Sequence, residues 1–213
     1  MTINRFFIIL IVLSALLFAA AFSFAGIEED MVEFSAYCKS IANNRAQFLN
    51  CLGEKAKEAE PEIDYVIAKL YYKEGNSKKS IYYLIRAAKK GYTEAKMELA
   101  RFYFSEGPNR NCKKTIYWLN EAIKDGNDTA RVRLANIYIF KKCDYGSSEE
   151  AFGLLLPAAK NGNANAQLTL GLMYKDGIGV NPDKEQARYW LKTAEQNDSS
   201  KVREVAREAL AQL

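Results

Sequence analysis

The stretch that decides the fold is residues 164–198, ANAQLTLGLMYKDGIGVNPDKEQARYWLKTAEQND. Within it Ala166, Leu170 and Tyr174 follow one another at a spacing of four, which places them on one face of an α-helix. The loop that follows contains two glycines and then Pro182, which suit a chain reversal and the start of a second helix. The stretch therefore predicts two helices joined by a short loop.

The same pattern recurs upstream at intervals of 35 or 36 residues, since Gly91, Gly126 and Gly162 each follow an Ala-rich helical stretch and Asn197 has the corresponding place. A glycine there suits the left-handed position after a helix, and a fixed period of this length is typical of stacked helical hairpins. Counterparts of the first-helix trio are Ala95, Leu99, Tyr103 and Ala130, Leu134, Tyr138. Eight residues before each terminal residue, the second helices carry a predicted core stripe of Tyr83, Trp118, Leu154 and Tyr189.

The pattern A-x-x-x-L-G-x-x-Y-x-x-G-x-G-V-x-x-D, followed by A-x-Y-W-x-x-x-A, resembles the Sel-1-like repeat, a relative of the tetratricopeptide repeat. The resemblance implies an all-α fold, a right-handed α-solenoid used for protein–protein contact. We expect about four repeats with a helical cap at each end. The predicted divisions are 26–60 for an N-terminal capping hairpin, 61–92, 93–127, 128–163 and 164–198 for the repeats, and 199–213 for a C-terminal capping helix.

The N-terminus predicts a targeting segment. Arg5 precedes an apolar run from Phe6 to Phe22, and the small residues Ser23 and Ala25 suit cleavage of a signal peptide spanning 1–25. The alternative is an uncleaved anchor, because about 20 apolar residues can span a bilayer. We therefore expect a periplasmic or secreted protein, in contact with a membrane only if this segment is retained. Cleavage leaves 29 − 26 = +3 charges, too few and too evenly spread to indicate nucleic-acid binding.

Four cysteines in an exported chain predict two disulfides, for which three pairings are possible. We favour Cys38–Cys51, because a hairpin turning in the helix-breaking stretch between them brings the two sulfurs together. We likewise favour Cys112–Cys143, because both fall in loops between the two helices of consecutive repeats. The alternative, a four-thiolate zinc site, lacks the usual C-x₂₋₄-C pairs.

The chain contains no histidine, which removes the common general base, the usual zinc ligand and every Ser–His or Cys–His nucleophile. The glycines at 177–179 follow a helix and lack the Gly-Lys-Ser/Thr ending of a phosphate loop. We therefore expect no catalytic residue, no cofactor and no metal, and predict that the protein is not an enzyme.

The candidate partner-binding residues lie on the first helix of each repeat, opposite the core trio. In the Sel-1-like family this helix generally lines the concave wall. Aromatic residues beside arginines have the composition of interface hot spots. The alternative is that the next repeat buries these side chains. The predicted positions are Lys69, Tyr72, Glu98, Arg101, Phe104, Arg133, Asn136, Ile139 and Leu172.

The leading functional hypothesis is a non-enzymatic periplasmic module that binds another protein. The resemblance implies two uses: an immunity protein that neutralises a secreted toxic effector such as a phospholipase, or a scaffold for an envelope or flagellar-motor complex. A third alternative is a β-lactam-binding or β-lactamase-like cysteine-rich repeat protein. Such proteins pair cysteines within every repeat, whereas here Cys112 and Cys143 fall in different repeats.

Overall fold

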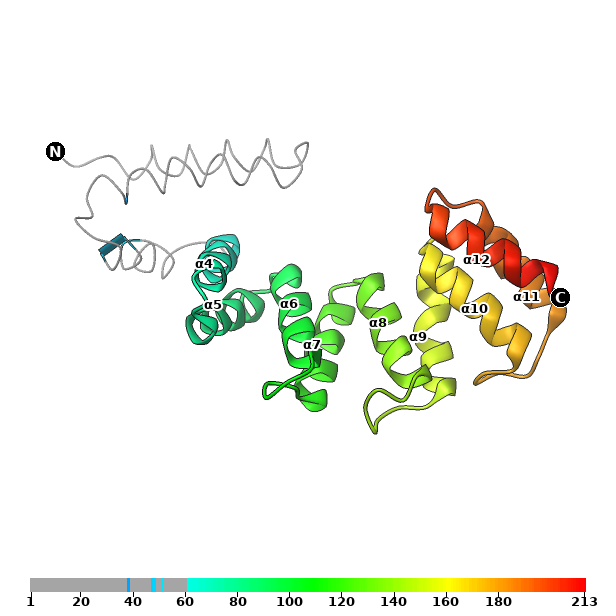
Figure 1. Cartoon of the computed structure of the whole chain (residues 1–213), viewed down its shortest axis with the longest axis horizontal. Coiled ribbons are helices and arrows are strands. Elements are labelled where there is room, and N and C mark those ends of the chain that lie inside the picture. Colours follow the sequence, from blue (N-terminus) through cyan, green and yellow to red (C-terminus); the bar gives the residue numbers. More distant parts are fainter. Residues whose placement is uncertain (1–37, 39–46, 49–50, 52–60) are drawn as a thin grey trace.

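The computed structural model describes residues 38, 47–48, 51 and 61–213. The predicted signal peptide, and all of the predicted capping hairpin except those four residues, lie outside the described part of the chain. Within that part every regular element is an α-helix, and the helix pairs follow one another in chain order along the long axis of the molecule, with α12 turning back over α10 (Figure 1). The prediction of an all-α solenoid is confirmed.

The helices form four consecutive pairs followed by one further helix. Each packs mainly on its neighbours in the chain, and the last one also contacts α10. The pairs are α4 (Pro61–Lys73) with α5 (Ser77–Lys89), α6 (Thr93–Phe104) with α7 (Cys112–Lys124), α8 (Asp128–Ile139) with α9 (Ser148–Lys160), and α10 (Ala164–Asp176) with α11 (Lys184–Glu195), and the last helix is α12 (Ser200–Ala211).

Short polar sequences between the helices set the period of the repeat. Gly126 ends α7 with a φ of 84°, and its N–H donates to the carbonyl of Ile123. The next residue, Asn127, caps α8 by accepting a hydrogen bond from the backbone N–H of Ala130. Gly162 and Asn163 make the same arrangement between α9 and α10. One Gly-Asn pair thus stops one helix and starts the next.

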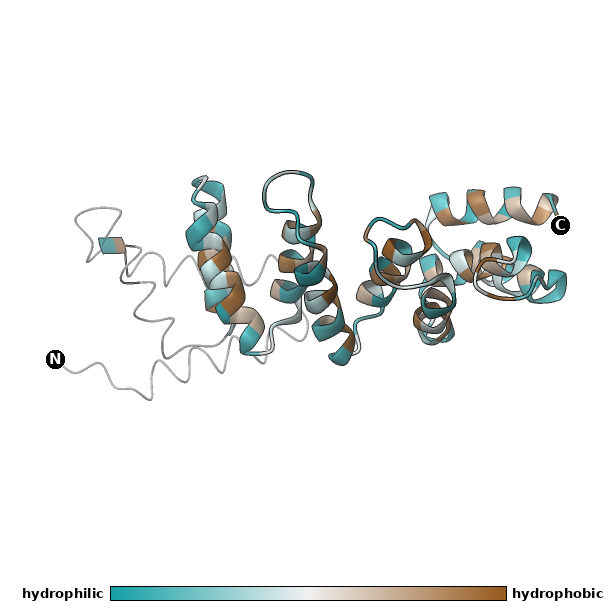
Figure 2. Ribbon diagram, turned by 90° about the horizontal axis from the view of Figure 1, so that it is seen from below, coloured by the Kyte–Doolittle hydropathy of each residue, from teal (hydrophilic) through white to brown (hydrophobic). Residues whose placement is uncertain are grey.

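The core follows the predicted first-helix stripe. Leu99, Leu134 and Leu170 are fully buried, and the alanines four residues before them are equally inaccessible. The polar and apolar residues alternate around the helices in Figure 2, as expected for helices that pack on both neighbours. The tyrosines at the end of this stripe are buried less completely, since Tyr138 and Tyr174 are partly exposed.

The predicted stripe in the second helices is wrong for the last repeat. Tyr189 is 59% exposed, and the neighbouring Trp190 is buried in its place. The reason is that α11 has 12 residues whereas α7 has 13, so counting back from Asn197 shifts the register by one. Counted from the helix start, Trp190 corresponds to Trp118. Asn197 also lacks the left-handed backbone of the three glycines that it was matched with.

Candidate functional site

A groove of about 690 Å³ lies between α4, α5 and α6, where the first described helix pair meets the second. Its base is apolar, formed by Ala68 and Tyr65 of α4 and Leu84 of α5, all of them buried. Phe102 of α6 and Ser105, the residue that follows α6, also line the groove. The groove is therefore lined by aromatic and aliphatic side chains.

The rim of the groove is charged. Lys69 and Lys73 of α4 and Arg101 of α6 line it, together with one carboxylate, Glu98. The Lys69 ammonium lies 5.7 Å from the centre of the Tyr65 ring, and Arg101 donates from Nε and Nη2 to Glu98 Oε2 at 2.9 and 2.5 Å. Three cations thus face one carboxylate, which makes the rim electropositive.

Two groups of the groove titrate away from neutral pH. Burial raises the pKa of the Tyr65 phenol, and the carboxylates of Glu98 and Glu94 raise it further. The hydrogen bond to Glu98 raises the pKa of the Arg101 guanidinium. The phenol therefore stays neutral and the guanidinium stays charged, an arrangement suited to binding and unsuited to proton transfer.

A buried ion-pair cluster fixes α4 against α5 and so positions two walls of the groove. Asp64 is inaccessible to solvent, and its carboxylate lies 3.3 Å from Arg86 Nη2 and 2.9 Å from Lys90 Nζ. The Arg86 guanidinium also lies over the rings of Tyr82 and Tyr83. Buried ion pairs contribute little net stability but restrict the geometry of the elements they join.

The groove is open because of the sequence of one loop. Residues 105–111, SEGPNRN, connect α6 to α7 and are all exposed, and the loop is hydrophilic throughout (Figure 2). In the last repeat the loop of equal length is 177–183, GIGVNPD, whose Ile178 and Val180 pack on the core cluster of α9 and α10. Counted back from the helix cap, the corresponding residues of the loop at 105–111 are Glu106 and Pro108, and both are exposed.

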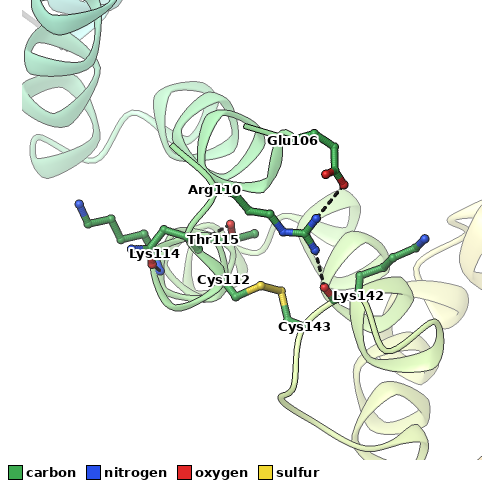
Figure 3. Close-up of a disulfide and its surroundings, with 8 residues drawn as sticks. Glu106, Arg110, Cys112, Lys114, Thr115, Lys142 and Cys143 are labelled. Carbon is green, nitrogen blue, oxygen red and sulfur yellow. Dashed lines mark hydrogen bonds and ion pairs between the residues drawn. A yellow bond between two sulfur atoms is a disulfide. The ribbon is translucent and has the colours of Figure 1, made fainter. Parts of the chain in front are cut away.

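The loop at 105–111 is instead attached to the following repeat, as Figure 3 shows. Arg110 donates from Nη1 to Glu106 Oε1 and from Nη2 to the carbonyl oxygen of Lys142, each at 2.7 Å. Two residues later Cys112 forms a disulfide with Cys143. These bonds direct the end of the loop towards the third helix pair rather than over the groove.

Both predicted disulfides are present, Cys38–Cys51 and Cys112–Cys143. One detail of the prediction is wrong: Cys112 is the first residue of α7 and not part of a loop. The difference arises because Asn111 caps the helix one residue earlier, by accepting a hydrogen bond from the backbone N–H of Lys114. Cys143 does lie in the loop between α8 and α9.

The predicted partner-binding residues differ in exposure. Lys69, Tyr72, Glu98 and Arg101 line the groove, and Tyr72 is 62% exposed. Of the remaining five, Arg133 is exposed. The other four are partly buried: Phe104, Asn136, Ile139 and Leu172. Among them, Phe104 and Ile139 pack against the core.

Sequence reasoning missed the residues at the base and end of the groove, above all Tyr65, Phe102 and Ser105. The available signal was the loop at 105–111, which departs from the G-x-G-V pattern of the last repeat. Among the described residues no cluster of three or more histidines, cysteines or acidic residues could hold a metal ion. A search of the same residues for an apolar helix of membrane-spanning length found none.

The sequence model of the Sel1 repeat matches residues 65–92, 93–127 and 164–199. The helix pair α8–α9 between the second and third matches has the same arrangement but departs from the consensus. The comparison with curated proteins found no significant match.

Two solved structures have the same fold. A protective antigen of uropathogenic Escherichia coli with an SLR fold is 20% identical with a TM-score of 0.60, covering 82% of this chain and 39% of that one. A Sel1 repeat protein from Oxalobacter formigenes is 27% identical with a TM-score of 0.59, covering 78% of this chain and 49% of that one.

The chain thus spans less than half the length of either structure. An immunity protein from Pseudomonas aeruginosa aligns with 12% identity and a TM-score of 0.40, covering 84% of this chain and 80% of that one, a similarity too low to support any inference. Three matched repeats, their paired helices and the same fold in a solved Sel1 repeat protein together assign this chain to the Sel1 repeat family.

Proposed function

We propose that the protein is a non-enzymatic module that holds one protein partner, with the groove between α4, α5 and α6 as its principal contact. Sel1 repeats mediate protein–protein contacts. The observation that carries the proposal is the aromatic base and cationic rim of this groove, to which Lys69, Tyr72 and Arg101 contribute. Buried aromatic anchors with arginine at the edge are the groups that dominate binding energy at interfaces.

The proposed location is the periplasm or the exterior of the cell. Disulfides persist in oxidising compartments, and both Cys38–Cys51 and Cys112–Cys143 are formed. The apolar segment within residues 1–25 supports export. Within this setting we favour a stoichiometric role, an immunity protein that neutralises a secreted toxic effector such as a phospholipase, because rigid cross-linked repeats suit the holding of a single partner.

Affinity capture tests the proposal. The protein is purified from the periplasm after expression of the full chain, immobilised, and exposed to periplasmic and secreted extracts, and the retained proteins are identified by mass spectrometry. A secreted toxin supports the immunity role, whereas a component of an envelope or motor complex supports the scaffold role instead. Sustained hydrolysis of nitrocefin by the purified protein contradicts the non-enzymatic assignment.

Charge reversal tests the groove itself. Arg101→Glu places a second carboxylate beside Glu98 and removes a rim cation, so we expect partner affinity to fall at least about tenfold. Arg188→Glu, at an exposed site on α11, is the matched control and leaves affinity unchanged. Far-ultraviolet circular dichroism checks that both variants retain their helices. Equal affinity of the Arg101 variant and the unmodified protein excludes the groove as the contact.

A further inference from the structure

We infer that the groove between α4, α5 and α6 takes a short apolar–Gly–apolar turn of the partner, flanked by acidic residues. This inference rests on the proposed function and names the chemistry of the segment that the partner contributes. Its evidence comes from the last repeat, where the protein fills the corresponding space with a segment of its own chain.

The corresponding loop, residues 177–183, shows what fits. It closes with a hydrogen bond from the Asp183 N–H to the Tyr174 carbonyl at 2.9 Å, and the loop at 105–111 closes likewise, from the Asn111 N–H to the Tyr103 carbonyl at 2.7 Å. The two loops therefore join equivalent residues, although the chain is one residue shorter between Tyr103 and Asn111 than between Tyr174 and Asp183.

Between these ends the two loops differ. Ile178 and Val180 pack against the cluster that contains Ala151 and Leu155 of α9. Counted from the helix start, the residues corresponding to that pair in α5 are Ser80 and Leu84, which line the groove. In the second repeat the corresponding loop residues, Glu106 and Pro108, are exposed to solvent.

The middle of the inserted turn must be glycine. Gly179 has a φ of 67°, and a Cβ there would lie 2.2 Å from the carbonyl oxygen of Ser148, the first residue of α9. The first residue of α5 is Ser77, which lines the groove at the same place. A turn that enters the groove in the same way therefore needs a glycine between its two apolar residues.

Charge selects the flanking residues of the occupant. Lys69, Lys73 and Arg101 line the groove, and Glu98 is the one carboxylate among the lining residues. Acidic side chains beside the turn complement this rim. The loop at 105–111 cannot easily fold back to compete, because Arg110 and Cys112 bind its end to Lys142 and Cys143.

The probe is the peptide of residues 176–183, DGIGVNPD, which contains the apolar–Gly–apolar turn between two aspartates. The peptide is added in increasing amounts to the ¹⁵N-labelled protein, and the amide signals are followed by NMR. We expect saturable shifts at the amides of Lys69, Arg101 and Ser105. A control peptide with Ile178→Ser and Val180→Ser loses two apolar contacts and binds at least about tenfold more weakly. Equal binding of the control peptide, or shifts confined to other repeats, overturns the inference.

Two protein variants complete the test. Grafting GIGVNPD in place of residues 105–111 fills the groove from within the chain, so we expect peptide binding to be lost. If the graft fails to fold, Lys69→Glu serves instead and weakens binding of the acidic peptide but not of a version with Asp176→Asn and Asp183→Asn. Unchanged binding in the folded variant overturns the inference.

The outcomes separate the inference from the proposed function. A graft that retains full affinity for the captured partner, while Arg101→Glu loses it, overturns the groove occupant and leaves the protein-binding role intact. Binding of the peptide in the groove, with no partner captured from any extract, overturns the binding role and leaves the ligand chemistry supported.

Discussion

The disulfide between Cys112 and Cys143 provides the most direct test of how the solenoid is stabilised. It closes 31 residues and joins the start of α7 to the loop between α8 and α9. In the chain-entropy model a loop of that length corresponds to 2.1 + 1.5R ln 31, or about 12 cal/mol/K, which is about 3.7 kcal/mol at 25 °C. The cross-link therefore accounts for a substantial part of the 5–15 kcal/mol that is typical of folded proteins.

The perturbation is the double substitution Cys112→Ala and Cys143→Ala. Alanine is preferred to serine because Cys143 is buried, and a hydroxyl there would lack a partner. The native arrangement should persist, since Arg110 still donates to the Lys142 carbonyl across the same gap, a bond of roughly 1 kcal/mol. We expect the midpoint of thermal unfolding to fall by roughly 7–15 °C, measured by circular dichroism.

Hydrogen exchange locates the effect. Because each repeat contacts only its neighbours, amides in α7 to α9 should lose more protection than those in α10 and α11. The matched control is Cys38→Ala with Cys51→Ala, which opens a loop of 13 residues, corresponds to about 2.9 kcal/mol and should weaken mainly α4. A loss below about 1 kcal/mol on removal of Cys112–Cys143, or an equal loss of protection in every helix, refutes the reasoning.

Two further predictions concern packing and charge. Gly171→Ala places a Cβ 2.6 Å from Leu191 Cγ and should lower the free energy of unfolding, measured in urea, by on the order of 1–3 kcal/mol. Gly153→Ala, also inside a helix but with open space around it, should instead raise the free energy of unfolding by about 1 kcal/mol. Equal effects of the two substitutions contradict this prediction. Although desolvation opposes it, hydrogen bonds from Lys96 and Thr93 hold the pKa of Asp125 below its usual 3.8. Since the pKa of Asp125 is lower in the folded than in the unfolded state, this carboxylate stabilises the fold above about pH 4, and the contribution is lost as the pH falls through the folded-state pKa. Asp125→Asn should abolish that loss of stability at acid pH. An unchanged urea midpoint between about pH 6 and pH 3 in the unmodified protein contradicts the prediction.

The fold could be predicted from the sequence because its determinants are local. The spacing of Ala, Leu and Tyr fixes which face of a first helix is buried, and Gly-Asn pairs such as Gly126–Asn127 fix where helices stop and start. The pairing of Cys112 with Cys143 could be predicted for the same reason, since equivalent points of adjacent repeats lie side by side. Whether Tyr189 or Trp190 is buried could not be predicted, because the last helix pair differs by one residue in length and only the structure shows the resulting register.

The groove could be predicted only in part. Lys69, Tyr72, Glu98 and Arg101 were identified by rotation about the helix axis, a local property. Whether neighbouring elements cover them depends on the conformation of loop 105–111, which the helical period does not describe. Asp64 gave no signal either, because an acidic residue in the first turn of a helix is ordinarily solvated, and only the packing of α4 on α5 buries it between Arg86 and Lys90.

The candidate site lies beside a loop, 105–111, that lacks the G-x-G-V pattern of the last repeat. Where the loop has the G-x-G-V pattern, at 177–183, Ile178 and Val180 pack on the core cluster of α9 and α10. Where the loop lacks that pattern, at 105–111, it is bound to the next repeat, and a groove lies between α4, α5 and α6. A loop that packs on the helices of its own protein buries their apolar side chains. A surface that can bind a partner therefore arises where a loop does not make that internal contact.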